Sequence, residues 1–308
     1  MIEETMLTPE MGVVLTGTRE DLPQVQRSAI DRHLRERGAV MLRGFDLTIE
    51  EYEDLSREMS PEFLVHHDVG RMFISEDGTT QSVVPGTYGL PAHVERGYAA
   101  PIPGLLFFYC NKPADEDGET TLFDGYEIFN NLTPEAQEFF RANKIRYRLR
   151  IAPELWQRTL MTDDHAEALY LVDQQLNSAV DREIGENASC RVEGDVLIMD
   201  FVTPSTRRSP RREGDAFSNS SLTYVHSLSL PQEGVLAVGG IDLRTEDDRP
   251  FPTDMLEEAI RAANAAEIKV KWNKGDMVFL DNRTVLHGRA PFRDQSRSVY
   301  VRIGFETL

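Results

Sequence analysis

The sequence predicts a mostly β fold, an antiparallel barrel or jelly roll with helices packed on it. Strand-like runs outnumber helical ones, and they are spread along the chain instead of alternating with helices as in a parallel α/β fold. The chain has 308 residues, of which 40% are hydrophobic and 28% are charged. This composition is ordinary for a globular protein and excludes wholesale disorder. Because no internal repeat or low-complexity linker divides the chain, we expect a single domain over residues 1–308.

The first elements follow from apolar periodicity and capping residues. A helix is predicted over residues 21–37, where apolar residues share one face and Gly38 provides the stop. A short apolar strand is expected at 39–42, and Thr48 should cap a second helix. Further strands are predicted at 105–110, 145–151, 196–201, 222–226, 268–272, 277–280 and 299–305, and further helices at 134–142 and 253–263.

The stretch from about residue 152 to 221 differs from its surroundings because it is polar. It carries the run TRRSPRR at 206–212. An insertion of this length on a barrel is usually a lid or a mobile surface excursion, and we predict a lid-like insertion here. Its arginines form either a solvated loop or a contact for an anionic group, such as a substrate carboxylate or an acidic carrier protein.

The charge balance excludes several classes of partner. Lysine and arginine number 33 against 52 aspartate and glutamate, which gives a net charge of −19. Such an acidic surface repels the phosphate backbones of nucleic acids and the anionic headgroups of lipids. We therefore expect no nucleic-acid binding and no membrane binding. The two cysteines, Cys110 and Cys190, cannot make a disulfide scaffold. With no signal-peptide pattern and no apolar run long enough to span a bilayer, a cytoplasmic location is predicted.

Three of the seven histidines have a carboxylate two residues later, at His66, His93 and His165, whereas chance predicts about one. Such a pair can chelate one metal only where the backbone is extended, because alternate side chains then share a face. His165 lies in a helical pattern, so we interpret it as a surface residue. The pair at His66 is left as a possible substrate contact, together with Tyr88 and the residues around 217–221.

The pair His93 and Glu95 is better placed, because it leads through a turn into the strongest apolar strand of the chain, at 105–110. A third ligand must come from elsewhere, and His287 follows the predicted strand 277–280. Two histidines and one carboxylate on one face leave about three coordination positions open, which is the arrangement of non-haem Fe(II) oxygenases.

The motifs around these residues are specific when taken together. They are GAVMLRGFDLTIEEYEDL at 38–55, HVERGY at 93–98, PGLLFFYCNKPADEDGETTLFDG at 103–125 and FLDNRTVLHGRAPF at 279–292. With them the chain resembles the Fe(II)/2-oxoglutarate-dependent oxygenases of the taurine dioxygenase and clavaminate synthase-like superfamily. The resemblance implies a double-stranded β-helix core, which is jelly-roll and cupin-like, with flanking helices.

The resemblance also implies roles for individual residues. His93, Glu95 and His287 would ligate Fe(II), and Thr120, 25 residues after Glu95, would bind the distal carboxylate of 2-oxoglutarate. An arginine after His287 would pair with the same carboxylate. Two candidates remain open, Arg297 ten residues after His287 and Arg302 fifteen residues after it. They should face opposite sides of a strand, and we favour Arg297.

The implied activity is O₂-dependent oxidation, most simply hydroxylation, of an unactivated C–H bond, coupled to decarboxylation of 2-oxoglutarate to succinate. The Glu variant of the motif looks closest to members that act on amino acids or similar small polar metabolites, free or carrier-tethered, in specialised biosynthesis. Glu95 argues against chlorination, since halogenating relatives lack this carboxylate. The alternatives are a non-catalytic barrel that binds a metal and an anion as a sensor or accessory protein, and a zinc or manganese hydrolase or isomerase.

Overall fold

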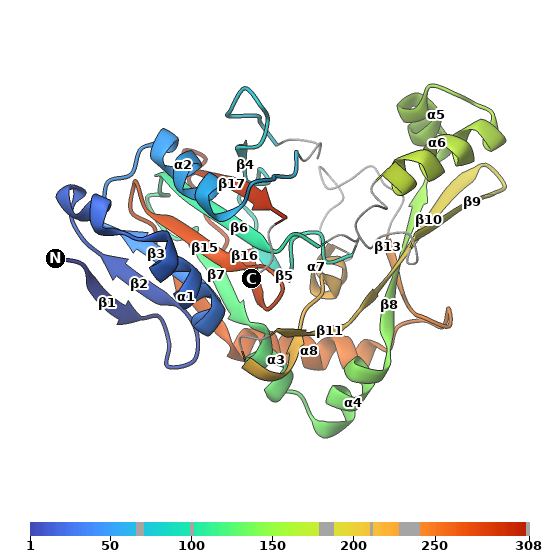
Figure 1. Cartoon of the computed structure of the whole chain (residues 1–308). Coiled ribbons are helices and arrows are strands. Elements are labelled where there is room, and N and C mark those ends of the chain that lie inside the picture. Colours follow the sequence, from blue (N-terminus) through green and yellow to red (C-terminus); the bar gives the residue numbers. More distant parts are fainter. Residues whose placement is uncertain (66–70, 99–101, 179–187, 210–211, 228–240, 306–308) are drawn as a thin grey trace.

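The computed structural model describes residues 1–65, 71–98, 102–178, 188–209, 212–227 and 241–305 (Figure 1). As predicted, the chain is mostly β with flanking helices. The largest sheet has seven strands in the order β1-β2-β3-β15-β6-β17-β4, and all its pairs are antiparallel except β2 with β3. Its strands are β1 (Glu3–Met6), β2 (Val13–Thr16), β3 (Ala39–Arg43), β4 (Gln81–Ser82), β6 (Leu105–Lys112), β15 (Met277–Asp281) and β17 (Ser298–Gly304).

A four-stranded antiparallel sheet packs face to face against the larger one. Its order is β14-β7-β16-β5, and its strands are β5 (Leu90–His93), β7 (Thr120–Asp124), β14 (Glu267–Val270) and β16 (Val285–Arg289). The hydrophobic cluster between the sheets draws on both, with Phe108 and Val278 from one and Leu122 and Val285 from the other.

Strand β6 explains why the centre of the chain is so apolar, because it is covered on both faces. Leu106 and Phe108 point toward the smaller sheet, whereas Leu105 and Phe107 point the other way, into a second cluster. Helices α1 (Arg27–Arg37) and α2 (Ile49–Met59) cover this outer face. A strand buried on both sides carries a continuous apolar run, which is the pattern observed at 105–110.

The amino-terminal helix is shorter than predicted. Residues 19–24 form a separate 3-10 helix, η1 (Arg19–Gln24), and α1 starts only at Arg27. Pro23 lies in η1, has no N–H to give to an α-helical hydrogen bond, and Val25 after it is extended. Two other predicted helix boundaries are confirmed. Gly38 ends α1 in the left-handed region with a φ of 74°, and Thr48 and Glu51 form a capping box at the start of α2.

The middle of the chain forms a third antiparallel sheet. It has the order β13-β8-β10-β9, with β8 (Lys144–Ile151), β9 (Ala188–Glu193), β10 (Val196–Pro204) and β13 (Ile241–Thr245). A hairpin of β11 (Thr206–Ser209) and β12 (Arg212–Phe217) follows. The other helices are α3 (Gly125–Asn130), α4 (Pro134–Ala142), α5 (Pro153–Leu160), α6 (His165–Ser178), α7 (Ser221–Ser227) and α8 (Thr253–Ala265).

Two predictions for this part are corrected. Residues 222–226 are not a strand but lie in helix α7, where Asn219 Oδ1 accepts hydrogen bonds from the backbone N–H and the hydroxyl of Ser221 at the helix start. The end of the predicted insertion, residues 217–221, is no surface excursion. It is buried, and Ser220 donates its hydroxyl to the carbonyl of Val94 at 2.7 Å.

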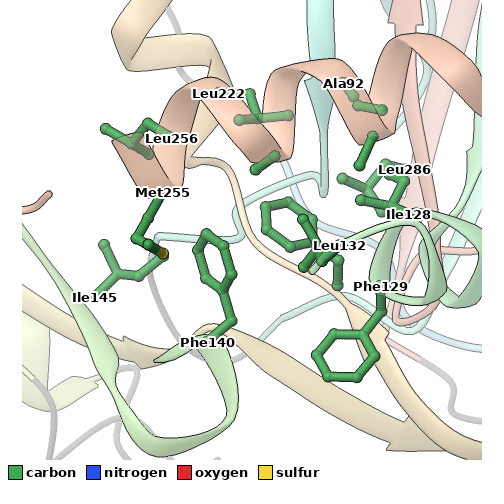
Figure 2. Close-up of a cluster of buried hydrophobic side chains, with 14 of the residues drawn as sticks. Ala92, Ile128, Phe129, Leu132, Phe140, Ile145, Leu222, Met255, Leu256 and Leu286 are labelled. Carbon is green, nitrogen blue, oxygen red and sulfur yellow. The ribbon is translucent and has the colours of Figure 1, made fainter. Parts of the chain in front are cut away.

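A further hydrophobic cluster covers the face of the smaller sheet that is turned away from the larger one. It joins Ala92 of β5, Val94 just after β5 and Leu286 of β16 to side chains of α3, α4 and α8. Figure 2 shows Ala92, Leu286 and Ile128 close together at one side of this cluster. Because alternate residues of a strand face opposite ways, these contacts turn the side chains between them toward the larger sheet. None of the described helices is long and apolar enough to cross a membrane.

Candidate metal centre

The structure brings together the three side chains predicted to be metal ligands. Strands β5 and β16 pair in a register that sets His93 opposite His287, and their ring centroids lie 4.2 Å apart. Glu95 follows β5 by two residues, and its Oε2 lies 3.8 Å from Nε2 of His287. One ligand atom from each of the three residues lies within 4.8 Å of the others. The predicted triad is therefore a geometric cluster, in which Glu95 and His287 are buried.

The close approach of β5 and β16 depends on Gly288. A Cβ atom at this position would lie 2.4 Å from the carbonyl oxygen of Leu90 and 2.7 Å from Oγ1 of Thr121. Both contacts are shorter than real Cβ atoms make, so any side chain would push the strands apart. The glycine directly after His287 therefore lets the two histidines share one small space.

Backbone and amide contacts fix the first two ligands. Nδ1 of His93 lies 2.9 Å from the carbonyl oxygen of Pro91, which leaves Nε2 for the cluster. Asn282 is fully buried; its Oδ1 accepts the N–H of Glu95 at 2.9 Å, and its Nδ2 donates to the carbonyls of Glu95 at 3.1 Å and Pro103 at 2.9 Å. Asn282, which directly follows β15, therefore holds the backbone of Glu95 on both sides.

The surroundings keep both histidines in the form that binds metals. Burial lowers the pKa of His93, and burial together with the neighbouring His93 lowers the pKa of His287 well below its ordinary value. Both rings are therefore neutral at pH 7, and a neutral imidazole has a lone pair for a metal. Two imidazole nitrogens and one carboxylate suit a non-haem Fe(II) with open positions, so the donor set fits the metal that the motifs implied.

A pocket between the two sheets adjoins the cluster. The smaller sheet contributes Thr120 to its wall, and the larger sheet contributes Phe108 and Val301. The guanidinium of Arg297 also lines it, and donates to the carbonyl of Gly118 at 2.8 Å and to Oγ1 of Thr120 at 3.4 Å. The structure thus places Thr120 and Arg297 together and next to the triad.

Arg297 and Thr120 are prepared for an anion. Burial and the neighbouring Arg289 lower the pKa of Arg297 to about 10, so the guanidinium is still charged at neutral pH. Oγ1 of Thr120 also accepts a hydrogen bond from Nε1 of Trp272, at 3.0 Å and buried. A hydroxyl accepts through two lone pairs and donates one proton. With Trp272 and Arg297 directed at the lone pairs, the proton of Thr120 is left to point elsewhere.

The structure corrects the prediction made for Arg302, the second candidate for binding 2-oxoglutarate. It is absent from the described residues that line the pocket, and it is buried on the opposite side of β17. Its guanidinium donates to the carbonyl of Glu53 and the hydroxyls of Ser56 and Thr79, and lies 3.8 Å from the ring centroid of Phe63. The expectation that the two arginines face opposite sides is met, and Arg302 fastens α2 to the sheet.

Sequence reasoning missed three residues at the site. Arg289 lines the pocket and donates to the carbonyls of Val84 and Tyr88. It is two residues after His287 on one strand, so alternation could have found it. Arg71 also lines the pocket, and Trp272 contacts Thr120 from the residues after β14. No pattern in the sequence singles out these two, because only the fold brings them near.

The other sequence candidates lie elsewhere. His165 is half exposed on α6, with Nε2 3.4 Å from Asp195, as a surface residue would be. His66 lies outside the described residues. Tyr88 contacts Arg289 through its ring and is not among the described residues that line the pocket. In the arginine run, Arg208 pairs with Asp215 at 2.8 Å and Arg212 with Glu127 at 2.9 Å, so these two charges are used within the chain.

Comparison with known proteins decides the family. Residues 4–303 match the sequence model of the Taurine catabolism dioxygenase TauD, TfdA family. The chain belongs to this family. The resemblance seen in the motifs is thereby confirmed, and with it the class of enzyme, a dioxygenase that uses Fe(II), 2-oxoglutarate and O₂.

Individual relatives of this TauD, TfdA family chain are distant but match over most of their length. It is 26% identical to the dapdiamide synthesis protein DdaC of Enterobacter agglomerans, over 89% of this chain and 84% of the other. It is 24% identical to the 3-((Z)-2-isocyanoethenyl)-1H-indole synthase of Fischerella ambigua, over 96% and 93%. The crystal structure of PvcB from Pseudomonas aeruginosa has the same fold, with a TM-score of 0.61 at 16% identity over 100% and 91%.

Proposed function

We propose that this dioxygenase hydroxylates an unactivated C–H bond of an amino acid or a similar small polar metabolite in a specialised biosynthetic pathway. The observation that carries the proposal is one pocket that combines the triad of His93, Glu95 and His287 with the pair of Thr120 and Arg297. A non-catalytic barrel that binds a metal and an anion has no need to retain both complete sets of groups side by side. We also propose that the two facing sheets form a jelly-roll core in a single domain, and that the insertion predicted at 152–221, apart from its buried end at 217–221, acts as a lid.

In the proposed site, His93 and His287 hold Fe(II) through neutral imidazoles, and Glu95 adds the one negative charge. When bound, the metal with 2-oxoglutarate and O₂ supplies the oxidising power to break the substrate C–H bond, while 2-oxoglutarate leaves as succinate and CO₂. The protein fixes the ligands and leaves the remaining positions open. Asn282 contributes by holding the backbone on both sides of Glu95, so the carboxylate stays aimed at the histidines.

Thr120 and Arg297 are proposed to bind the distal carboxylate of 2-oxoglutarate. Arg297 offers a partly buried positive charge that its contacts with a carbonyl and a hydroxyl do not neutralise. The hydroxyl of Thr120 accepts from Trp272 and Arg297, so its proton is available to a carboxylate oxygen in the pocket. Together they supply a charge-assisted contact and a neutral hydrogen bond to the same anion.

The substrate proposal draws on the relatives and on the surface. Two relatives are described by their part in making dapdiamide and an isocyanoethenyl indole, which supports a role in specialised biosynthesis. A free small molecule fits better than a carrier-tethered one, because Arg208 and Arg212 are paired with acidic groups of the chain. An acidic carrier protein would have to displace them. A cytoplasmic location is in keeping with this proposal.

The proposal is tested by the requirements for 2-oxoglutarate turnover. The purified protein should convert 2-oxoglutarate to succinate only with Fe(II) and O₂, and a true substrate from an amino-acid panel should accelerate it. His93→Ala and His287→Ala should each abolish it. Succinate formation that persists in either variant would contradict the metal assignment. A hydrolase or isomerase would act on its substrate whether or not 2-oxoglutarate is present.

A further inference from the structure

One end of the pocket holds two arginines whose contacts with the described residues are all with neutral groups. Arg289 and Arg297 both line the pocket, and each guanidinium lies over the ring of Phe292, at 5.4 and 5.5 Å from its centroid. Burial and the charge of Arg289 lower the pKa of Arg297, so the two cations are near enough to repel each other. The other charged residues of the lining, Arg71 and Glu95, lie against each other. Like charges removed from water are costly until an anion joins them, so this end is suited to an anion.

The register of β16 against β7 explains how Arg289 comes to this end. Arg289 is directly opposite Thr120 in the antiparallel ladder, so both side chains leave the sheet on the same face, with Cβ atoms about 5 Å apart. His287 is two residues before Arg289, and the alternation of a strand turns its side chain to that face as well. One strand therefore carries a proposed metal ligand and, about 7 Å further along, a cation beside the proposed carboxylate site.

Arg289 is fixed in place and keeps hydrogen-bonding capacity. Its Nη1 donates to the carbonyl of Val84 at 2.7 Å, and its Nε and Nη2 donate to the carbonyl of Tyr88 at 3.3 and 3.0 Å. Of the five N–H groups of a guanidinium, these contacts with the described residues use three and leave one each on Nη1 and Nη2. The residue is only 5% exposed, so bulk water has little access to these groups. A carboxylate in the pocket would be a strong acceptor for them.

We propose that Arg289 binds the distal carboxylate of 2-oxoglutarate together with Arg297 and Thr120, and that it makes the site select a 2-oxo acid with a second carboxylate. This inference rests on the proposed function, because it takes the triad as the metal site and Thr120 with Arg297 as the carboxylate site. A co-substrate with a neutral end would leave two neighbouring cations without a counter-charge. Arg289 is then a binding residue and more than a support for the chain at 84–88.

The test compares two 2-oxo acids that share the chelating end and the number of carbons. 2-Oxoglutarate ends in a carboxylate, whereas 2-oxopentanoate ends in a methyl group. Each is titrated without oxygen into the protein loaded with Fe(II), and the visible absorption of the chelate gives both Kd values without turnover. The parent protein should bind 2-oxoglutarate at least about 100-fold more tightly, because two contacts between charged groups are missing in the complex with 2-oxopentanoate.

Variants then assign the preference to the residue. Arg289→Gln should raise the Kd of 2-oxoglutarate about 10- to 100-fold and change that of 2-oxopentanoate less than about twofold. Arg289→Lys keeps the charge but loses the fork, so it should raise only the Kd of 2-oxoglutarate, by about 3- to 10-fold, and it decides the question should Arg289→Gln fail to fold.

The chain offers a matched control on the other side of β17. Arg302 is also a buried arginine that donates to neutral acceptors, the carbonyl of Glu53 and the hydroxyl of Ser56, but it does not line the pocket. Arg302→Gln therefore removes a similar set of structural contacts. It should leave the Kd values of both acids unchanged.

Two results would overturn the inference and leave the proposed function intact. The first is an Arg289→Gln protein that binds 2-oxoglutarate as tightly as the parent protein. The second is an equal rise in the Kd values of both acids, which would mean that Arg289 only supports the chain at Val84 and Tyr88. A parent protein that forms no chelate absorption, or that binds both acids equally well, would contradict the proposed function itself and the inference with it.

Discussion

Replacing Trp272 by phenylalanine should weaken the binding of 2-oxoglutarate without touching any group that contacts it. The substitution keeps an aromatic ring but removes the N–H that Trp272 donates to Oγ1 of Thr120 at 3.0 Å. Without this donor, the hydroxyl of Thr120 is no longer restricted to one orientation. Its proton then spends less time directed at the proposed carboxylate.

The magnitude follows from the cost of one buried hydrogen bond. A hydrogen bond to a charged group contributes about 1.5–3 kcal/mol, and a Thr120 hydroxyl that is no longer oriented toward the carboxylate should lose about 1–2 kcal/mol of it. Trp272 is largely buried, so water cannot replace the lost N–H freely. A loss of about 1–2 kcal/mol corresponds to a rise of about 5- to 30-fold in the Kd of 2-oxoglutarate.

The assay is anaerobic titration of the Fe(II)-loaded protein with 2-oxoglutarate, followed by the visible absorption of the chelate. The chain provides a matched control in its other tryptophan. Trp156 is also buried and donates from Nε1 to the carbonyl of Asp195 at 2.8 Å, but it packs against α6 and β10 and does not line the pocket. Trp156→Phe should lower the free energy of unfolding and leave the Kd of 2-oxoglutarate unchanged.

A double-mutant cycle separates an orienting role from a general loss of packing. If Trp272 acts through Thr120, then Trp272→Phe should have almost no further effect on the Kd of 2-oxoglutarate in a Thr120→Ala protein. The reasoning is refuted if Trp272→Phe binds 2-oxoglutarate like the parent protein. It is refuted equally if the effects of the two substitutions simply add.

Three further predictions concern the ligands and the fold. Asn282→Ala should lower the affinity for Fe(II) about 10- to 100-fold by releasing the backbone of Glu95. The affinity is measured by competition with a chelator, and a variant that binds Fe(II) as tightly as the parent protein would disprove this prediction. Arg302→Met should lower the free energy of unfolding by about 2–3 kcal/mol, because the buried acceptors of Arg302 lose their donor, and it should leave the Kd of 2-oxoglutarate unchanged. A raised Kd would mean that Arg302 contributes to the binding of 2-oxoglutarate after all. The metal-free protein should lose stability as the pH falls through 6.5, because unfolding restores the lowered pKa values of His93 and His287 and so takes up protons. The urea midpoint should therefore drop less between pH 7.5 and 5.5 in His287→Gln than in the parent protein. Equal drops in the two proteins would contradict buried neutral rings.

The sequence could predict those parts of the site that lie on strands near one another in the chain. The spacing of His93 and Glu95 predicted that both would ligate the metal, but only His93 lies on β5, whereas Glu95 is in the turn that follows and is held there by Asn282. Most strands, including those that became β6, β15 and β17, were also predicted, because buried strands carry long apolar runs. The helix α7 was predicted as a strand, because in seven residues an apolar run looks alike in both and only the contact of Asn219 with Ser221 distinguishes them.

The parts that could not be predicted depend on contacts between distant segments. Trp272 is 152 residues from Thr120, and Arg71 reaches Glu95 from a segment without a recognisable pattern. The choice between Arg297 and Arg302 needed the pairing of β17 with β6, since spacing alone left both open. Pattern arguments locate residues on an element, whereas the partners of a side chain are set by how the sheets pack.

The measurement that tests the account most directly is titration of the metal-free protein with Fe(II) and 2-oxoglutarate without oxygen, followed by admission of O₂. The protein should show a weak visible absorption that needs both ligands, and this absorption should disappear with release of succinate once O₂ enters. His287→Ala should show neither. If Fe(II) binds but no absorption forms with 2-oxoglutarate, then Thr120 and Arg297 do not hold this co-substrate, and the interpretation of the pocket is contradicted.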